Sequence, residues 1–248
     1  MGWKKIGRIF APPGSGWMRS HAQNPLPEAL GNGYFRVHFS TRDEKNRARG
    51  GAFVFNIEQP TVISDLSVTP TIDLGTLGAF DDAGVMPSSI VDHEHAKFMF
   101  YTGWSRTIDV PFAFHCGLAI SNRDGAFTRA SRAPVLGRNY YDPYVTGAPY
   151  VVLDSGLFRM WYASCTEWIF RENEDRARHF YTIKHAESAD GISWKCSAQL
   201  CISYGKDEYA IARPVVWKNP DGFRMWFTFR GSSQTYRIGE AQSTDGIH

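Results

Sequence analysis

Carboxylate residues recur at three related places in this chain, each a few residues before a proline. They are Asp82, Asp142 and Glu208. Two carboxyl groups that face each other across a pocket can divide the work of glycoside cleavage. One stays protonated as the acid, and the other stays ionised as base or nucleophile. We therefore take these three as candidate catalytic residues, with Asp82 and Glu208 as the pair and Asp142 assisting.

The same segments carry aromatic, basic and amide side chains. An aromatic ring can stack on a sugar, and a guanidinium can bind an anionic group or lower the pKa of a nearby carboxyl. Arg42 opens a charged run, 42–49, which is either a solvated loop or a loop over the site that binds a phosphate or an acidic sugar. The candidate substrate-binding residues are His21, Asn24, Arg42, Asp81, Trp104, Tyr144, Tyr209 and Arg213.

Other polar residues fit structural roles better. Asp124, Asp190 and Asp245 each precede a glycine, and Asp-Gly suits the positive φ of hairpin turns. The Asp-His-Glu-His run at 92–95 lacks the helical HExxH spacing of a zinc site, so we expect an exposed turn there. We predict no metal ion and no cofactor.

An internal repeat indicates which strands position the candidate site residues. Four segments end at Pro27, Pro87, Pro149 and Pro214, which are 60, 62 and 65 residues apart. An aromatic strand follows each proline, at 34–39, 98–101, 158–162 and 223–227, and Phe-Arg-Met-Trp occurs twice. Three or four strands in each repeat are typical of a β-propeller blade. Two separate β-sandwiches would explain the exact copies less well.

The repeat predicts an all-β chain forming one propeller domain over 1–248. The expected blades are 18–80, 81–140, 141–205 and an incomplete 206–248, and the segment 3–10 could supply a closing strand. Either the chain is a fragment of a five-bladed protein of roughly 310 residues, or four blades close into a ring. We favour the fragment.

Several motifs resemble those of known proteins. They are the turn Ala-x-Ser-x-Asp-Gly-Ile-x-Trp at 186–194, its relative at 241–247, Phe-Tyr-Thr-Gly-Trp at 100–104 and the two Phe-Arg-Met-Trp strands. Over about 18–248 the chain is similar to the five-bladed β-propeller glycosidases. These include the arabinanase/xylosidase, invertase/levanase and mannosyl-glycan phosphorylase families, that is, glycoside hydrolase families 43, 32 and 130.

The resemblance implies one catalytic acid in each of the first three blades. Asp82 matches the second-blade acid by position, Asp142 lies near the third, and Glu208 belongs to the fourth unit. The first unit offers 21–24, His-Ala-Gln-Asn, where a base Asp is expected. This departure leaves room for a phosphorylase or transferase, in which an external nucleophile replaces the base.

These observations predict a carbohydrate-active enzyme that cleaves or transfers glycosidic bonds of an oligosaccharide or sugar phosphate. The alternative is a non-catalytic carbohydrate-binding or scaffold propeller in a polysaccharide biosynthesis system. A net charge of +2 argues against nucleic-acid binding. Without an apolar run long enough to span a bilayer or a signal-peptide block, we expect no membrane partner and a cytoplasmic location with reduced cysteines. The oligomeric state stays open.

Overall fold

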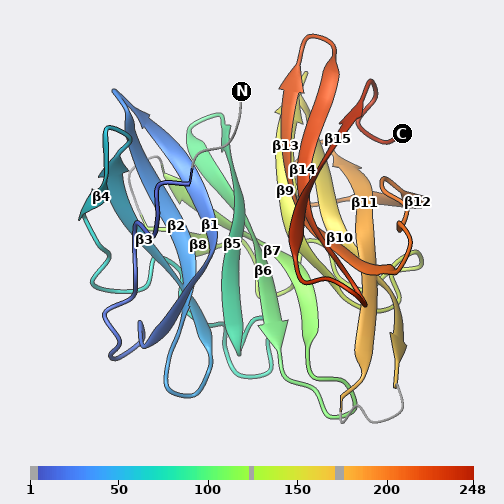
Figure 1. The fold of residues 1–248 in the computed structure, drawn as a ribbon, viewed down its shortest axis with the longest axis horizontal. Coiled ribbons are helices and arrows are strands. Elements are labelled where there is room, and N and C mark those ends of the chain that lie inside the picture. Colours follow the sequence, from blue (N-terminus) through green and yellow to red (C-terminus); the bar gives the residue numbers. More distant parts are fainter. Residues whose placement is uncertain (1–4, 123–125, 171–175) are drawn as a thin grey trace. The chain divides into compact units, whose positions relative to one another are not determined.

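A computed structural model describes residues 5–122, 126–170 and 176–248 (Figure 1). The elements of these residues are strands joined by turns and loops, which confirms the all-β prediction. Within these ranges no helix is long and apolar enough to cross a membrane. The chain forms two compact units, one of residues 1–74 and 85–87, the other of residues 75–84 and 88–248. Each unit is described by itself.

The first unit contains one complete blade. Its strands are β1 (Ser20–Gly31), β2 (Tyr34–Arg42), β3 (Ala48–Asn56) and β4 (Gln59–Ser64), paired antiparallel in chain order.

Aromatic side chains form the core of this blade. The Phe10 ring lies 4.9 Å from the Phe39 ring and 4.7 Å from the Phe53 ring. The segment 3–10 was predicted as a closing strand, but its described part, 5–10, forms no strand. It instead delivers Phe10 to the core of this unit.

The second unit contains three further groups of strands. In the first group are β5 (Gly84–His93, of which 85–87 belong to the first unit), β6 (Ala96–Ser105), β7 (Ala113–Asn122) and β8 (Thr128–Arg129). In the second are β9 (Thr146–Asp154), β10 (Leu157–Ile169), β11 (Arg178–Ser188) and β12 (Lys195–Leu200). The third holds β13 (Glu208–Asn219), β14 (Gly222–Gly231) and β15 (Arg237–Ser243).

Each group pairs as an antiparallel meander, and β11 also meets β13 in a parallel bridge, Tyr181 to Ala210. These groups confirm the propeller-type fold. Whether 1–248 is a single domain stays a prediction.

Buried aromatic and aliphatic side chains join the groups of the second unit. Phe100 and Leu118 of one group share a core with Phe158 and Met160 of the next. In the repeated Phe-Arg-Met-Trp strands, Met160 and Trp161 are fully buried and Met225 is nearly so. Met160, Trp161 and Met225 therefore lie in the core between blades, as sheet packing requires, whereas Trp226 is only partly buried.

The Asp-Gly turns form as expected. Asp190 Oδ1 accepts hydrogen bonds from the backbone N–H groups of Ile192 (2.8 Å) and Ser193 (2.7 Å). These bonds lower the pKa of Asp190 to about 2. Asp245 accepts the same pattern of bonds, whereas Asp124 lies outside the described residues. The 92–95 run lies at the β5–β6 hairpin, as predicted: Asp92 and His93 end β5, and Glu94 and His95 form the turn.

A bulge interrupts three inner strands at the same place. In β1, β9 and β13 the pairing skips two residues, of which the first has a left-handed backbone and the second is proline. The left-handed residues are Asn24 (φ 57°), Ala148 (φ 49°) and Arg213 (φ 55°). The structure therefore aligns Pro25, not Pro27, with the prolines of the later blades. Backbone strain of this kind gathers at functional sites and re-aims side chains.

Candidate functional site

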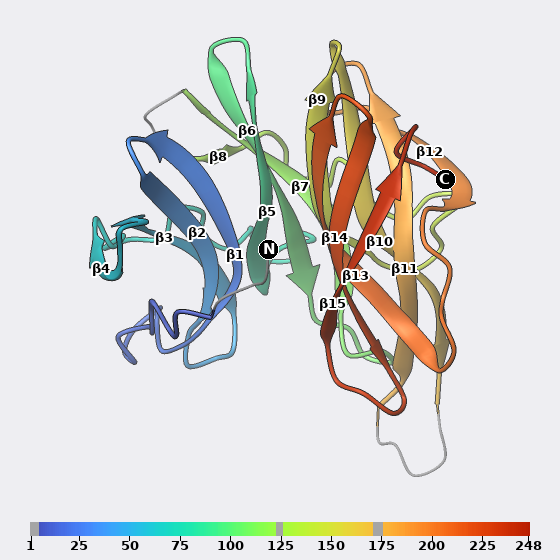
Figure 2. The same ribbon diagram turned by 45° about the horizontal axis from the view of Figure 1, so that its top comes forward.

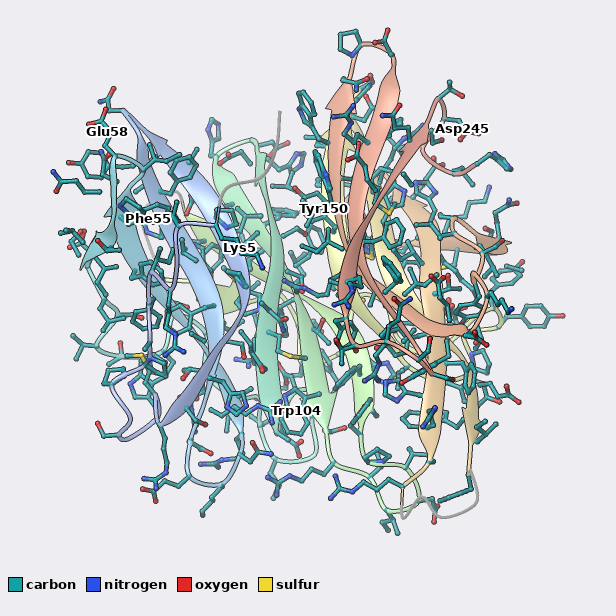
Figure 3. All side chains as sticks on the ribbon, in the orientation of Figure 1. Lys5, Phe55, Glu58, Trp104, Tyr150 and Asp245 are labelled. Carbon is teal, nitrogen blue, oxygen red and sulfur yellow. The ribbon has the colours of Figure 1, made fainter. Side chains whose placement is uncertain are left out.

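The inner strands of the second unit bring most candidate residues to one end. Hairpins β5–β6, β9–β10 and β13–β14 lie at one end of this unit, so the starts of β5, β9 and β13 share the other end (Figures 1 and 2). Figure 3 labels Trp104, near the end of β6, at this second end. Asp82, Asp142 and Glu208 lie at or just before these strand starts.

Asp81 is the first buried carboxylate of this end, with 0% of its surface exposed. Tyr101 Oη donates a hydrogen bond to its Oδ2 (3.0 Å), and Arg129 Nε donates another (2.7 Å). Burial, and then the Asp81 charge, raise the pKa of Tyr101. The other oxygen, Oδ1, faces Gly75, where an added Cβ would lie 1.9 Å away. Asp81 was predicted to bind substrate, but this packing closes it off from solvent.

Asp142 repeats this arrangement one blade later and is likewise 0% exposed. Its Oδ2 accepts hydrogen bonds from Tyr162 Oη (2.9 Å) and Asn139 Nδ2 (2.9 Å). Its Oδ1 accepts from Ser164 Oγ (2.6 Å) and Lys184 Nζ (3.0 Å). With each oxygen bonded twice, the carboxylate ties the loop before β9 to β10 and β11. It has no side open to a substrate in this arrangement, although the sequence suggested a catalytic role.

Asp81 and Asp142 are bonded in the same way, and the fourth blade lacks this arrangement. In both blades a tyrosine 20 residues later bonds the acid, and a cation from a later strand pairs with it. In the fourth blade Phe227 takes the place of Tyr101 and Tyr162, because the Phe-Arg-Met-Trp motif is followed by Phe at 227 and by Tyr at 162. The acids that open β13 are consequently not sealed by a phenol and a cation.

Asp82 and Glu208 are the more accessible carboxylates of the predicted set, and both are half-buried. The Gly78 N–H donates to Asp82 Oδ2 (3.0 Å), and the Gly205 N–H donates to Glu208 Oε2 (2.7 Å). Within the described residues, each carboxylate keeps its other oxygen without a protein donor. One backbone bond orients such a group and still leaves an oxygen for proton transfer.

Two of the predicted sugar-stacking aromatics at this end, Trp104 and Tyr144, differ in exposure. Trp104 is only 9% exposed and packs over the start of β5, where a Cβ on Gly84 would lie 1.5 Å from its Nε1. Little of its ring is left for a sugar. Tyr144 is 36% exposed, so its ring offers more contact area.

Tyr209 lies in a group of rings and guanidinium groups. The Arg178 guanidinium lies 4.9 Å from the centroid of the Tyr209 ring, and that of Arg230 lies 5.2 Å away. Arg230 also lies 4.7 Å from the Tyr236 ring, and the hydroxyls of Tyr181 and Tyr236 are 2.5 Å apart. We call Arg230, Tyr209, Tyr236 and Tyr181 the Arg230 cluster. Sequence reasoning missed all of it except Tyr209, because its members come from three strands and the β14–β15 loop and share no motif.

Arg213 stands at the β13 bulge and is half-buried. Burial lowers its pKa to about 10. In the part of the chain that is described, no carboxylate lies within ion-pair distance of its guanidinium. A desolvated cation without a counter-ion favours a functional role over a structural one.

The first unit holds the remaining candidates. His21 is exposed with φ 66°, and Asn24 Nδ2 lies 3.3 Å from Met86 Sδ. Arg42 Nη1 donates to Asn46 Oδ1 (2.8 Å) within the charged loop. Their role in binding stays a prediction.

The described residues contain no group of three His, Cys, Asp or Glu side chains that could hold a metal ion. A small hollow of about 50 Å³ lies beside Trp161, Phe223 and His248, and none of the predicted site residues lines it. The hollow therefore does not include the candidate carboxylates Asp82, Asp142 and Glu208.

The fold and the site define a class of protein. A glycosyl hydrolase from Bacteroides ovatus has a similar structure, with a TM-score of 0.73 over 99% of this chain and 76% of its own, at 16% identity. A thermostable family-43 glycoside hydrolase gives a TM-score of 0.66 over 92% and 70%, also at 16% identity. At such identities the likeness shows the fold alone, a propeller-type fold that these glycoside hydrolases share.

No family model matches the sequence. Two curated relatives from Mycobacterium tuberculosis, "Uncharacterized protein Rv1502" and "Uncharacterized protein MT1551", are 39% identical over 249 residues. The match covers 100% of this chain and 81% of each relative. The chain therefore belongs to the family of Rv1502 and MT1551.

Proposed function

We propose that the protein is a carbohydrate-active enzyme that cleaves or transfers glycosidic bonds, with Glu208 and Asp82 as the carboxyl pair. The observation that carries the proposal is the different environment of the acids at one end of the second unit. Asp81 and Asp142 are fully buried and each is bonded by a tyrosine and a cation, while Asp82 and Glu208 are half-buried and each is bonded by one backbone N–H. The propeller glycosidase fold supports the same reaction class.

The chemistry needs one acid and one base or nucleophile. Glu208 and Asp82 would supply these two roles, and an external nucleophile such as phosphate could replace water. Tyr144 offers a ring for the sugar, and Arg213 a charge that can bind an anionic group of the substrate. The substrate class is an oligosaccharide or a sugar phosphate.

Turnover of an aryl-glycoside panel, with and without inorganic phosphate, tests the proposal. Glu208→Gln and Asp82→Asn should each abolish turnover and leave the melting temperature nearly unchanged, since neither side chain makes an ion pair in the described structure. Glu187→Gln is the matched control, because Glu187 pairs with Arg159 on β10 (3.7 Å) and should not affect turnover. Full activity in both site variants would remove these residues from the catalytic site.

A binding-only propeller is the second candidate. It is favoured by the burial of Asp142 and by the absence of an acid in the 21–24 segment. Saturable sugar binding by the wild-type protein, without turnover of any glycoside in the panel, would select this candidate.

A further inference from the structure

Arg230 is a partly buried guanidinium without a counter-ion. It lies near the end of β14, opposite Ala210 of β13, and its Nε is buried without an acceptor. No carboxylate of the described residues lies within ion-pair distance of it. The Nε of Arg224, on the same strand, also lacks a hydrogen-bond acceptor, but this guanidinium differs in having a counter-ion, because Glu240 Oε1 lies 3.3 Å from it.

Arg213 adds a second uncompensated cation to the same pair of strands. Its backbone is three residues beyond the partner of Arg230, at the strained bulge of β13. Buried charges in proteins are normally paired, since desolvation is costly. Two such cations on neighbouring strands indicate that the negative charge comes from a ligand.

The surrounding side chains suit an anionic sugar. Tyr209 and Tyr236 hold the Arg230 guanidinium over their rings, and the Tyr181–Tyr236 hydroxyl pair can donate to an oxyanion. His179 stacks on Tyr181 at 4.8 Å. Burial and then the Arg230 charge lower its pKa to about 4, so it is neutral near pH 7.

We propose that the Arg230 cluster is a subsite for the acidic group of a sugar, either the carboxylate of a uronic acid or a phosphate ester. A guanidinium fixed against aromatic rings loses little freedom on binding and meets either oxyanion with paired N–H donors. The proposal rests on the proposed function, because Tyr209 directly follows Glu208 and places the acidic sugar at the same end of β13.

Isothermal titration of the wild-type chain with D-glucuronate, glucose 6-phosphate, inorganic phosphate and glucose tests the subsite. We expect at least one acidic sugar to bind about 10-fold or more tightly than glucose, with affinity falling as salt rises. Preference for glucuronate or for glucose 6-phosphate identifies the acidic group. Equal affinity for glucose and both acidic sugars, or no binding of either acidic sugar, would overturn the proposal.

Variants localise the effect. Arg230→Gln should weaken binding of the acidic sugar about 10-fold or more, whereas Arg224→Gln, on the same strand, should leave it unchanged. Circular dichroism checks that each variant is folded. If Arg230→Gln does not fold, Tyr236→Phe, which removes only a hydroxyl, replaces it in the test and should also weaken binding. Unchanged affinity in the folded Arg230→Gln or Tyr236→Phe protein refutes the subsite.

The two proposals fail separately. A Glu208→Gln protein that binds the acidic sugar while the wild type shows no turnover retains the subsite and refutes the catalytic assignment. A wild-type protein that cleaves neutral glycosides and binds no acidic sugar retains the catalytic assignment and refutes the subsite.

Discussion

Replacing Asp142 with asparagine separates a structural role from a catalytic one. The carboxylate is fully buried and bonded to Tyr162, Ser164, Asn139 and the ammonium of Lys184. Asp142→Asn leaves that ammonium without its counter-ion, while the Tyr141 carbonyl (2.7 Å) still accepts one of its hydrogen bonds. Breaking a buried pair by removing one partner costs about 3–5 kcal/mol. At about 2–4 °C per kcal/mol for a chain of this size, the melting temperature should fall by roughly 6–20 °C.

Differential scanning calorimetry of four proteins measures this effect. The wild type is compared with Asp142→Asn, Lys184→Met and the double variant. The double variant should recover part of the loss, because neither charge is then left unpaired, and the cycle gives a coupling of about 1 kcal/mol or more. Asp82→Asn is the control and should change stability by less than about 1 kcal/mol. An Asp142→Asn protein with unchanged melting temperature and no turnover would refute our reasoning and restore Asp142 to the catalytic set.

Two further predictions concern packing and pH. Gly84→Ala should lower stability by about 1–3 kcal/mol, because the new Cβ would meet the buried Trp104 ring, and an unchanged midpoint in urea would contradict that packing. His185 is 5% exposed, and burial lowers its pKa to about 4, below the usual value of about 6.5 for a histidine. The unfolded chain therefore binds a proton first as pH falls below about 6.5, and up to about 3 kcal/mol of stability is lost progressively down to pH 4. In a plot of melting temperature against pH, His185→Gln should have a smaller slope than the wild type between pH 6.5 and 4. Equal slopes for the two proteins would contradict the prediction.

Much of the fold could be predicted from local patterns. The aromatic strands at 34–39, 98–101, 158–162 and 223–227 all lie within strands of the structure, and the Asp190 and Asp245 turns close as expected. The alignment at Pro27 was wrong by two residues, because Pro25 and Pro27 both fit the repeat. Only the backbone shows that the bulge falls at Asn24.

The sequence by itself determined the blade repeat, its turns and the acids at or just before the starts of three of the four inner strands, because these depend on residues close together in the chain. Only the tertiary structure decided which acids are sealed. Asp142 meets Lys184 across 42 residues and Asp81 meets Arg129 across 48, and the same spacing could have left either carboxylate in solvent. The Arg230 cluster likewise exists only where β11 and β14 flank β13. The ionisation and accessibility of a carboxylate depend on neighbours that the fold assembles, so sequence spacing nominates catalytic acids and burial selects among them.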